Sequence, residues 1–315
     1  MLQIRPATSD EDLAHIARIV TTVTPDFPIS VAEMRWQQER YPGGGRFLAW
    51  RDEVPVGAGG AGRAYSYPAD FPGLWGNISV LPEHRRQGVG VAILAALMDL
   101  ARSSGKTMLI GRTTEDRVEA LEFLAHRGFV EHERMKAVRL DLAGVEPPAV
   151  EPPARIEITS LEARPDLVEA VYAVALEALP DIPGDGPMAP GTLEEFRMRD
   201  VDREVIPPGA FAVAVEAATG RVVGYANLMI VSGNPQVAWH GMTAVARAWR
   251  GRGVAMALKR ATIAWAVARK LEALETANDT DNAPMRAVNQ RLGYRSLPDE
   301  VYVRGPVTQA PVAAR

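Results

Sequence analysis

The sequence predicts an α/β (α+β) fold that is built twice, as two similar domains of sheet and helices on one chain. Three observations predict it. The chain has 315 residues, about twice the common size of a single domain of roughly 100–150 residues. One motif recurs at a constant spacing, and each copy alternates strand-like and helix-like segments.

Composition places the chain among ordinary globular proteins, with 47% hydrophobic and 23% charged residues. The net charge of -4 offers no basic surface for a phosphate backbone, so we expect no nucleic-acid partner. No apolar run approaches the roughly 20 residues of a membrane helix, and the first residues lack a signal-peptide pattern. We therefore expect a cytoplasmic protein that does not enter a membrane.

The residue types that are missing exclude several chemistries. The chain has no cysteine, so it can form no disulfide, no thiolate metal site and no cysteine-bound acyl intermediate. Its five histidines show no metal-ligand spacing, and we expect no metal. Acyl transfer in such a chain must be direct or must use another nucleophile.

The repeated motif fixes the register between the two copies. Residues 85–90 read Arg-Arg-Gln-Gly-Val-Gly, and residues 250–255 read Arg-Gly-Arg-Gly-Val-Ala, 165 residues later. The Gly-aromatic pairs at 128–129 and 293–294 keep the same offset. Four prolines in the segment between the copies favour an extended spacer. The predicted domains are therefore 1–145 and 155–315, with 146–154 as a Pro-rich linker.

Each copy is predicted to follow the same order of elements, opening on a short strand and a helix. In the first copy we expect strands at 2–5, 46–51, 54–62, 75–81, 107–111 and 134–142, and helices at 10–20, 30–40, 89–104 and 116–127. In the second copy we expect strands at 155–159, 210–217, 221–231, 237–246, 271–277 and 299–304, and helices at 165–179, 253–269 and 281–292.

The helices after the two glycine-containing turns are the best supported of these elements. Apolar residues recur there at spacings of three and four, for example Val89, Ile93 and Leu97 in the first copy. Val254, Leu258 and Ala261 do the same in the second copy. One apolar face predicts that each helix packs on a sheet.

A strand that ends in such a turn and runs into a helix is suited to bind a pyrophosphate. Small residues let the backbone approach a ligand, and the first turn of the helix presents unpaired N–H groups at the positive end of its dipole. Arg85, Arg86, Arg250 and Arg252 add positive charge. Glycines at this junction also serve simple close packing, but two copies at one offset favour ligand binding.

Both turns fit the pattern [Gln/Arg]-x-x-Gly-x-[Gly/Ala], the central signature of the Gcn5-related N-acetyltransferase (GNAT) superfamily, which the chain resembles in tandem. The resemblance covers nearly the whole chain, although the first strands and helices of each copy match by order only. It implies a mixed, mostly antiparallel sheet flanked by helices in each domain. It also implies acetyl-CoA, with its pyrophosphate on the turn and its pantetheine arm along the fourth strand.

The resemblance assigns cofactor contacts to the end of the fourth strand and to the turn of each copy. These residues are Ser79, Val80, Leu81, Arg85, Arg86, Gln87, Gly88, Val89 and Gly90, and in the second copy Thr243, Ala244, Val245, Arg250, Gly251, Arg252, Gly253, Val254 and Ala255.

The second copy matches the family better beyond the turn. An asparagine at the start of the following helix contacts the pantetheine region in the family, and Asn282 stands at that position with Asn278 as support. The first copy has Arg117 there. Asn282 could instead simply cap its helix, because asparagine side chains accept hydrogen bonds from the first turn.

Neither copy has the family's usual proton donor. Many relatives carry a tyrosine four residues before the Gly-aromatic pair, which protonates the leaving thiolate, whereas this chain has Leu124 and Asn289. Neither side chain can act as an acid.

The base is equally open. His240 is the first candidate by type, since the histidine pKa lies near neutrality, and Tyr294, Tyr302 and Glu300 follow it. A lone histidine beside a tryptophan is more often a packed residue.

The resemblance therefore predicts an acetyl-CoA-dependent N-acetyltransferase that acts on a small-molecule primary amine by direct transfer, with the C-terminal copy favoured as the catalyst. The missing tyrosines keep open a CoA-binding sensor or scaffold without catalysis, and a third possibility places catalysis in the N-terminal copy. The oligomeric state is also open, and a monomer whose two copies mimic a dimer is compatible with the repeat.

Overall fold

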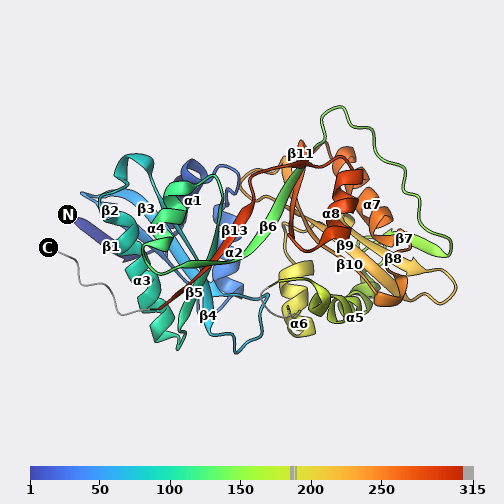
Figure 1. Cartoon of the computed structure of the whole chain (residues 1–315), viewed down its shortest axis with the longest axis horizontal. Coiled ribbons are helices and arrows are strands. Elements are labelled where there is room, and N and C mark those ends of the chain that lie inside the picture. The colour runs from blue at the N-terminus through green and yellow to red at the C-terminus, as the bar shows by residue number, and fades with distance from the viewer. Residues whose placement is uncertain (185–187, 189, 308–315) are drawn as a thin grey trace. The chain divides into compact units, whose positions relative to one another are not determined.

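The computed structural model describes residues 1–184, 188 and 190–307 (Figure 1). The chain divides into two compact units. Among the described residues, unit 1 contains Met1–Ala64, Asp70–Glu133 and 300–307, and unit 2 contains Tyr65–Ala69 and the chain from Arg134 to Asp299.

Unit 1 is a sheet of six strands in the order β1-β2-β3-β4-β5-β13. Every neighbouring pair is antiparallel except the parallel pair β4 and β5. Its elements are β1 (Leu2–Pro6), α1 (Asp10–Val23), α2 (Val31–Arg40), β2 (Gly45–Arg51), β3 (Val54–Arg63), β4 (Gly73–Val80), the 3-10 turn η1 (Pro82–His84), α3 (Val89–Ser103), β5 (Met108–Thr114), α4 (Val118–Ala125) and β13 (Glu300–Pro306).

Helices cover both faces of this sheet. Leu13, Ile16 and Ile19 of α1 pack with Ala58 of β3 on one face. On the other face, α3 lies so close to β3 that a Cβ atom added at Gly59 would stand 2.3 Å from the Ile93 side chain. Glycine in β3 therefore allows the close approach of α3. The small side chains of β3 also leave room for the site described below.

Unit 2 repeats this architecture, with strand order β7-β8-β9-β10-β11-β6 and one parallel pair, β10 and β11. Its elements are β6 (Val130–Asp141, in this unit from Arg134 on), β7 (Ile156–Ser160), η2 (Pro165–Leu167), α5 (Val168–Ala178), η3 (Leu179–Asp181), α6 (Leu193–Phe196), the π-helical turn η4 (Arg197–Val201), η5 (Pro208–Ala210), β8 (Phe211–Glu216), β9 (Val222–Ile230), β10 (Val237–Val245), η6 (Arg247–Trp249), α7 (Val254–Ala268), β11 (Ala273–Asp279), α8 (Ala283–Arg291) and β12 (Arg295–Ser296), which pairs with β6. The predicted mixed, mostly antiparallel sheet flanked by helices is confirmed in both units.

The last strands of the two copies are exchanged. β6 follows the first copy in the chain but pairs with β11 of unit 2, and β13 follows the second copy but pairs with β5 of unit 1. Glu300–Pro306 is therefore built into the compact unit formed by the first copy, whereas the predicted division at 145 and 155 follows chain order and stays a prediction. The reason is that a strand's partner is chosen by long-range pairing, which the order of elements does not specify.

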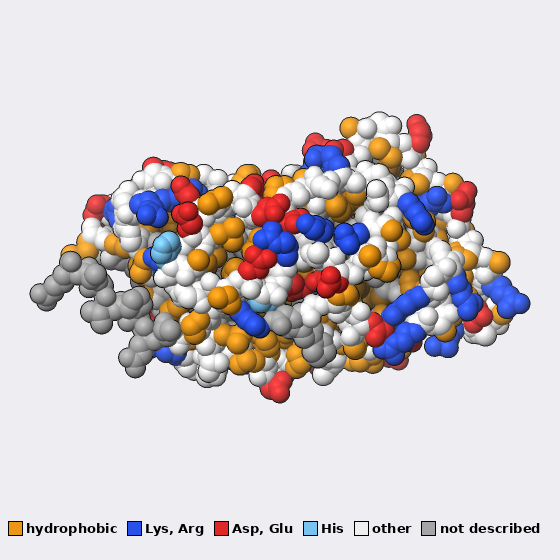
Figure 2. Space-filling model, viewed as in Figure 1, with side chains coloured by type: hydrophobic (Ala, Val, Ile, Leu, Met, Phe, Trp, Pro, Cys, Tyr) orange, Lys and Arg blue, Asp and Glu red, His pale blue; other side chains and the backbone are white. Residues whose placement is uncertain are grey.

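No helix within the described residues is long and apolar enough to cross a membrane. On the face shown in Figure 2, basic and acidic side chains are interspersed with apolar ones.

Candidate active site

The two glycine-containing turns adopt the same backbone conformation. Gly88 and Gly253 are the N-caps of α3 and α7, with φ of 81° and 86°, in the left-handed region that glycine adopts freely. Two residues earlier, Arg86 and Gly251 also have positive φ, 58° and 71°. Neither N-cap makes a side-chain hydrogen bond to its helix, so the first N–H groups of both helices are left for an anion.

In each unit the two parallel strands separate just before this turn. β4 and β5 pair only over Gly73–Trp75 and Met108–Ile110, and β10 and β11 pair only over Val237–Trp239 and Ala273–Glu275. Beyond these three pairs the two strands share no further ladder, and in unit 2 the Thr276 hydroxyl donates to the His240 carbonyl at 3.0 Å. Both units therefore contain the V-shaped opening that the resemblance implies.

In unit 1 this opening leads into a cavity of about 1190 Å³. The turn contributes Arg85, Arg86, Gly88 and Gly90 to its lining, and β4 and β5 contribute 75–80 and 110–114. Further lining residues come from α1, the loop to α2, α4 and the exchanged strand β13. The cavity therefore joins the anion-binding turn to the gap between the parallel strands.

Two arginines of like charge lie at the turn side of this cavity. Burial and the neighbouring Arg86 lower the pKa of Arg127 from its usual value. The Arg127 guanidinium lies over the Phe123 ring, with its carbon 3.8 Å from the ring centroid. Two cations close enough to disfavour each other would be stabilised by a bound phosphate.

At the sheet side of the cavity, β13 places a carboxylate that the first copy itself lacks. Glu300 is 1% exposed, and its two oxygens accept hydrogen bonds from Arg112 Nη1 at 2.7 Å and from the Tyr302 hydroxyl at 3.1 Å. The pKa of Arg112 is raised because Glu300 and Tyr302 outweigh its burial. Burial raises the pKa of Tyr302 well above its usual value, so the hydroxyl keeps its proton.

In unit 2 the turn is engaged by the chain itself. Asp181 of η3 accepts hydrogen bonds from Arg247 at 2.7 Å and pairs with Arg250 at 2.8 Å, and these contacts lower the pKa of Asp181 to about 2. Glu177 Oε1 accepts from the backbone N–H of Arg247 at 2.5 Å. The Asp181 carboxylate therefore already binds Arg250, the arginine of the turn that would contact a pyrophosphate.

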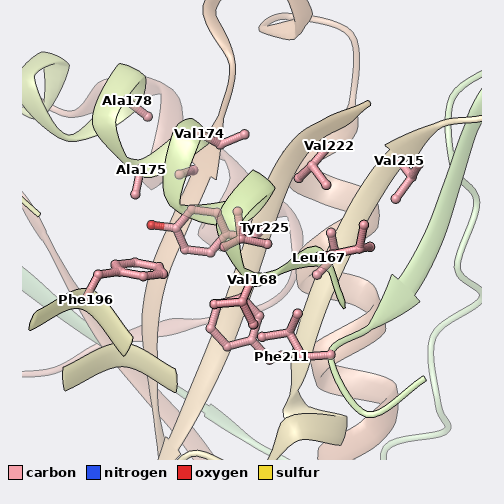
Figure 3. Close-up of a cluster of buried hydrophobic side chains, with 14 of the residues drawn as sticks. Leu167, Val168, Val174, Ala175, Ala178, Phe196, Phe211, Val215, Val222 and Tyr225 are labelled. Atoms are coloured by element: carbon pink, nitrogen blue, oxygen red, sulfur yellow. The ribbon is translucent and has the colours of Figure 1, made fainter. Parts of the chain in front are cut away.

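The sheet face beside α5 in unit 2 is filled by aromatic side chains (Figure 3). The Phe211 and Tyr225 rings stack at 5.5 Å, and Phe196 of α6 meets the Tyr225 ring edge-on at 6.4 Å. All three are at most 1% exposed.

The pairing registers show what stands at the same places in unit 1. Val213 faces Tyr225 as Leu48 faces Ala58, and Phe211 faces Asn227 as Arg46 faces Gly60. Unit 1 thus has Ala58 and Gly60 where unit 2 has Tyr225 and Asn227.

The predicted base, His240, lies in the interior of unit 2 beside Tyr294. It is 1% exposed, its Nδ1 is 3.2 Å from the Tyr294 hydroxyl, and its Nε2 is 3.2 Å from the Thr262 hydroxyl. Burial and the nearby Lys259 lower its pKa well below the usual value. His240 thus has the surroundings of a packed, hydrogen-bonded residue. Its burial argues against a role as general base, because a base must contact the substrate.

The two asparagines of the second copy have partners within their own unit. Asn282 caps α8 by accepting from the Met285 N–H at 3.3 Å. Asn278 Oδ1 accepts from Asn289, whose own Oδ1 accepts from the buried Lys259 ammonium at 2.6 Å. Burial lowers the pKa of Lys259 to about 7. This polar chain replaces the apolar pair Leu94 and Leu124 of unit 1, and sequence reasoning missed Lys259 because it lies within an apolar helical pattern.

The structure thus divides the predicted site residues between two places. The predicted residues that line the cavity of unit 1 are Ser79, Val80, Arg85, Arg86, Gly88 and Gly90. Leu81 and Val89 are buried, and Gln87 bonds to Arg51. Thr243–Val245 and the second turn hold the same position in unit 2. Tyr302 and Glu300, considered for the second copy, lie in unit 1, apart from His240 and Tyr294 in unit 2.

The chain matches the sequence profile of the acetyltransferase (GNAT) family twice, over residues 13–129 and 172–294. Among curated proteins it is 27% identical over 258 residues to a mycothiol acetyltransferase of Clavibacter michiganensis subsp. michiganensis, covering 80% of this chain and 77% of the relative.

Two solved structures share the fold over nearly the full length. A tandem GNAT protein from the clavulanic acid biosynthesis pathway has a TM-score of 0.76 at 23% identity, covering 98% of this chain and 99% of that one. A GCN5-related N-acetyltransferase from Sphaerobacter thermophilus has a TM-score of 0.75 at 19% identity, covering 97% and 96%.

Proposed function

Because the chain belongs to the acetyltransferase (GNAT) family, we propose that it is an acetyl-CoA-dependent N-acetyltransferase that modifies a small-molecule primary amine by direct transfer, and that both ligands meet in unit 1. We place the reaction in unit 1 because a cavity of about 1190 Å³ runs there from the first turn into the gap between β4 and β5.

The residues of unit 1 fit acetyl-CoA. A Cβ atom added at Gly88 would meet no atom within 4 Å, so the turn is open above its N-cap. The uncapped first turn of α3 offers N–H groups to a pyrophosphate, and Arg86 and Arg127 supply charge for phosphate oxygens. Acetyl-CoA, when bound, supplies the acyl group as a thioester. The gap beyond Trp75 and Ile110 offers backbone groups to the arm that carries it.

The sequence favoured the C-terminal copy, and the contacts in unit 2 argue for the other one. Asp181 binds both Arg247 and Arg250 within 2.8 Å, whereas the counterpart Arg85 of unit 1 pairs with the exposed Glu119 at 3.4 Å. Asn278 accepts a hydrogen bond from Asn289, and Asn282 caps α8. In addition, the buried ring of Phe211 stands at the position of Arg46, which lines the cavity in unit 1. We propose that unit 2 supports the enzyme structurally.

A CoA-binding sensor without catalysis is the second candidate. Leu124 lines the cavity at the position where the resemblance implies a tyrosine acid, and it offers no proton to a leaving thiolate. A cytoplasmic location, a small-molecule acceptor and a monomer with a dimer-like domain pair remain proposals alongside both functions.

Release of free thiol from acetyl-CoA in the presence of primary amines tests the proposal. Gly88→Val forces a β-branched residue into left-handed backbone beside the pyrophosphate position, and we expect it to lower turnover at least a hundredfold. Gly253→Val is the matched control, because Gly253 has nearly the same φ, and we expect turnover within threefold of the parent protein.

The two variants also separate the alternatives. Loss of turnover in Gly253→Val alone would move catalysis to unit 2. Acetyl-CoA binding with no thiol release above hydrolysis for any amine would favour the sensor.

A further inference from the structure

Resting on the proposed function, we infer that the acceptor is a primary amine with an apolar body. That body lies on a wall formed by α1 and the loop to α2, and its amino group donates a hydrogen bond to Glu300.

The wall is an apolar surface that the protein leaves partly uncovered. Val20, Val23 and Ile29 line the cavity and are neither buried nor fully exposed. Phe27 lines it beside them, with the Arg112 guanidinium over one face of its ring at 4.4 Å. A cluster of partly exposed apolar side chains facing one cavity gains free energy from an apolar ligand, by roughly 25 cal/mol per Å² of apolar surface removed from water.

Glu300 is the carboxylate of the cavity suited to receive the amino group. The other acidic lining residues, Asp116 and Glu119, are exposed, and each pairs with a neighbour, Thr114 and Arg85 respectively. Glu300 is buried, and its bonds to Arg112 and Tyr302 use one acceptor direction on each oxygen. An ionised carboxylate has further lone pairs for an amine N–H.

The charge of Arg112 decides which form of the amine is bound. Arg112 already neutralises Glu300, so a second cation beside it would meet repulsion from the guanidinium. A neutral amine donates to the same carboxylate without that cost. Direct transfer requires the neutral amine, because its nitrogen lone pair must be free to attack.

Unit 2 shows that ring-sized apolar groups fit a face of this kind. At the positions that correspond to Arg46 and Ala58 of unit 1, it carries the stacked rings of Phe211 and Tyr225. Unit 1 has no aromatic residue at either position. Arg46 lines the cavity together with Gly60 and Met34, whereas Ala58 is buried under α1.

A matched pair of amines tests the acceptor class. Hexylamine and 2-(2-aminoethoxy)ethanol have chains of equal length, but in the second an ether oxygen replaces one methylene and a hydroxyl replaces the terminal methyl. We expect kcat/KM for hexylamine to exceed that for the ether amine at least tenfold. Calorimetric binding of hexylamine to the CoA-saturated protein should show the same preference without turnover.

Variants identify the surface. Val20→Thr adds a hydroxyl to the wall at nearly constant volume and should lower kcat/KM for hexylamine several-fold, whereas Val54→Thr on the exposed end of β3 should leave it unchanged. Glu300→Gln should raise KM for hexylamine at least tenfold with unchanged CoA affinity, and Glu300→Asp should restore part of the loss.

Equal or better kcat/KM for the ether amine, or an unaltered KM in Glu300→Gln, would overturn the inference while leaving acetyl transfer intact. Tight hexylamine binding without any thiol release would instead preserve the acceptor site and reject the proposed enzyme.

Discussion

Glu300 and Arg112 form an ion pair at 2.7 Å on the neighbouring strands β13 and β5, although 188 residues separate them in the chain. The pair exists because the last strand of the chain completes the sheet that the first copy begins. It brings a buried carboxylate into the cavity of unit 1, where the carboxylates that the first copy supplies, Asp116 and Glu119, are exposed.

The ion pair makes a prediction about stability. Glu300→Ala leaves Arg112 without its partner, and we expect a loss of about 1–3 kcal/mol, less than for a fully buried pair because the Arg112 side chain is 31% exposed. Glu300→Gln should cost less, since the amide still accepts from Arg112. Urea unfolding of these variants, combined with Arg112→Met in a double-mutant cycle, measures the coupling. Additive effects of Glu300→Ala and Arg112→Met would contradict it.

Much of the fold could be predicted from local patterns. The helices after the turns, predicted at 89–104 and 253–269, are found at Val89–Ser103 and Val254–Ala268, because their apolar spacing and the preceding glycine define a helix locally. The pairing of β13 with β5 was not predictable in this way. The last strand of each copy has the same place in the order of elements, so the local sequence does not show which sheet it joins.

In the candidate site, too, local features could be predicted from the sequence and tertiary contacts could not. The turns were located correctly on strand-to-helix junctions, since glycine spacing alone marks them. The preference for the second copy rested on Asn278 and Asn282, and no local pattern indicates that Asn289, itself bonded to Lys259, donates to Asn278. Nor does the sequence near Tyr225 reveal that its ring packs against Phe211 and Phe196, at the position that the small Ala58 holds under α1 in unit 1.

The buried Lys259 predicts a pH-dependent stability of unit 2. Its pKa is lowered to about 7 in the folded state, whereas the unfolded chain keeps the usual value near 10.5. Between these values the unfolded state binds more protons, so stability rises with pH by on the order of 1 kcal/mol per pH unit from this group and stays flat below pH 7. Urea unfolding from pH 7 to 10 should show this slope in the parent protein and not in Lys259→Met. Parallel pH profiles for the two proteins would be inconsistent with a neutral folded-state lysine. Working above pH 7 also keeps His240 neutral in both states, so it adds no slope.

The aromatic filling of unit 2 predicts a large cavity effect. Tyr225→Ala removes a ring that stacks on Phe211 and meets Phe196, and we expect a loss of about 3–5 kcal/mol in the free energy of unfolding. Tyr225→Phe keeps the ring and should change stability by less than about 1 kcal/mol. Thermal or urea unfolding checks both. A small effect of Tyr225→Ala would mean that the ring is not part of a packed core.

The central claim is that this chain holds one acetyl-CoA, in unit 1. Calorimetric titration with CoA tests it most directly, because it counts sites without a known acceptor. The account predicts one site per chain in the parent protein, loss of that site in Gly88→Val, and a titration of Gly253→Val that matches the parent. Two sites in the parent protein, or a single site that disappears in Gly253→Val and persists in Gly88→Val, would contradict it.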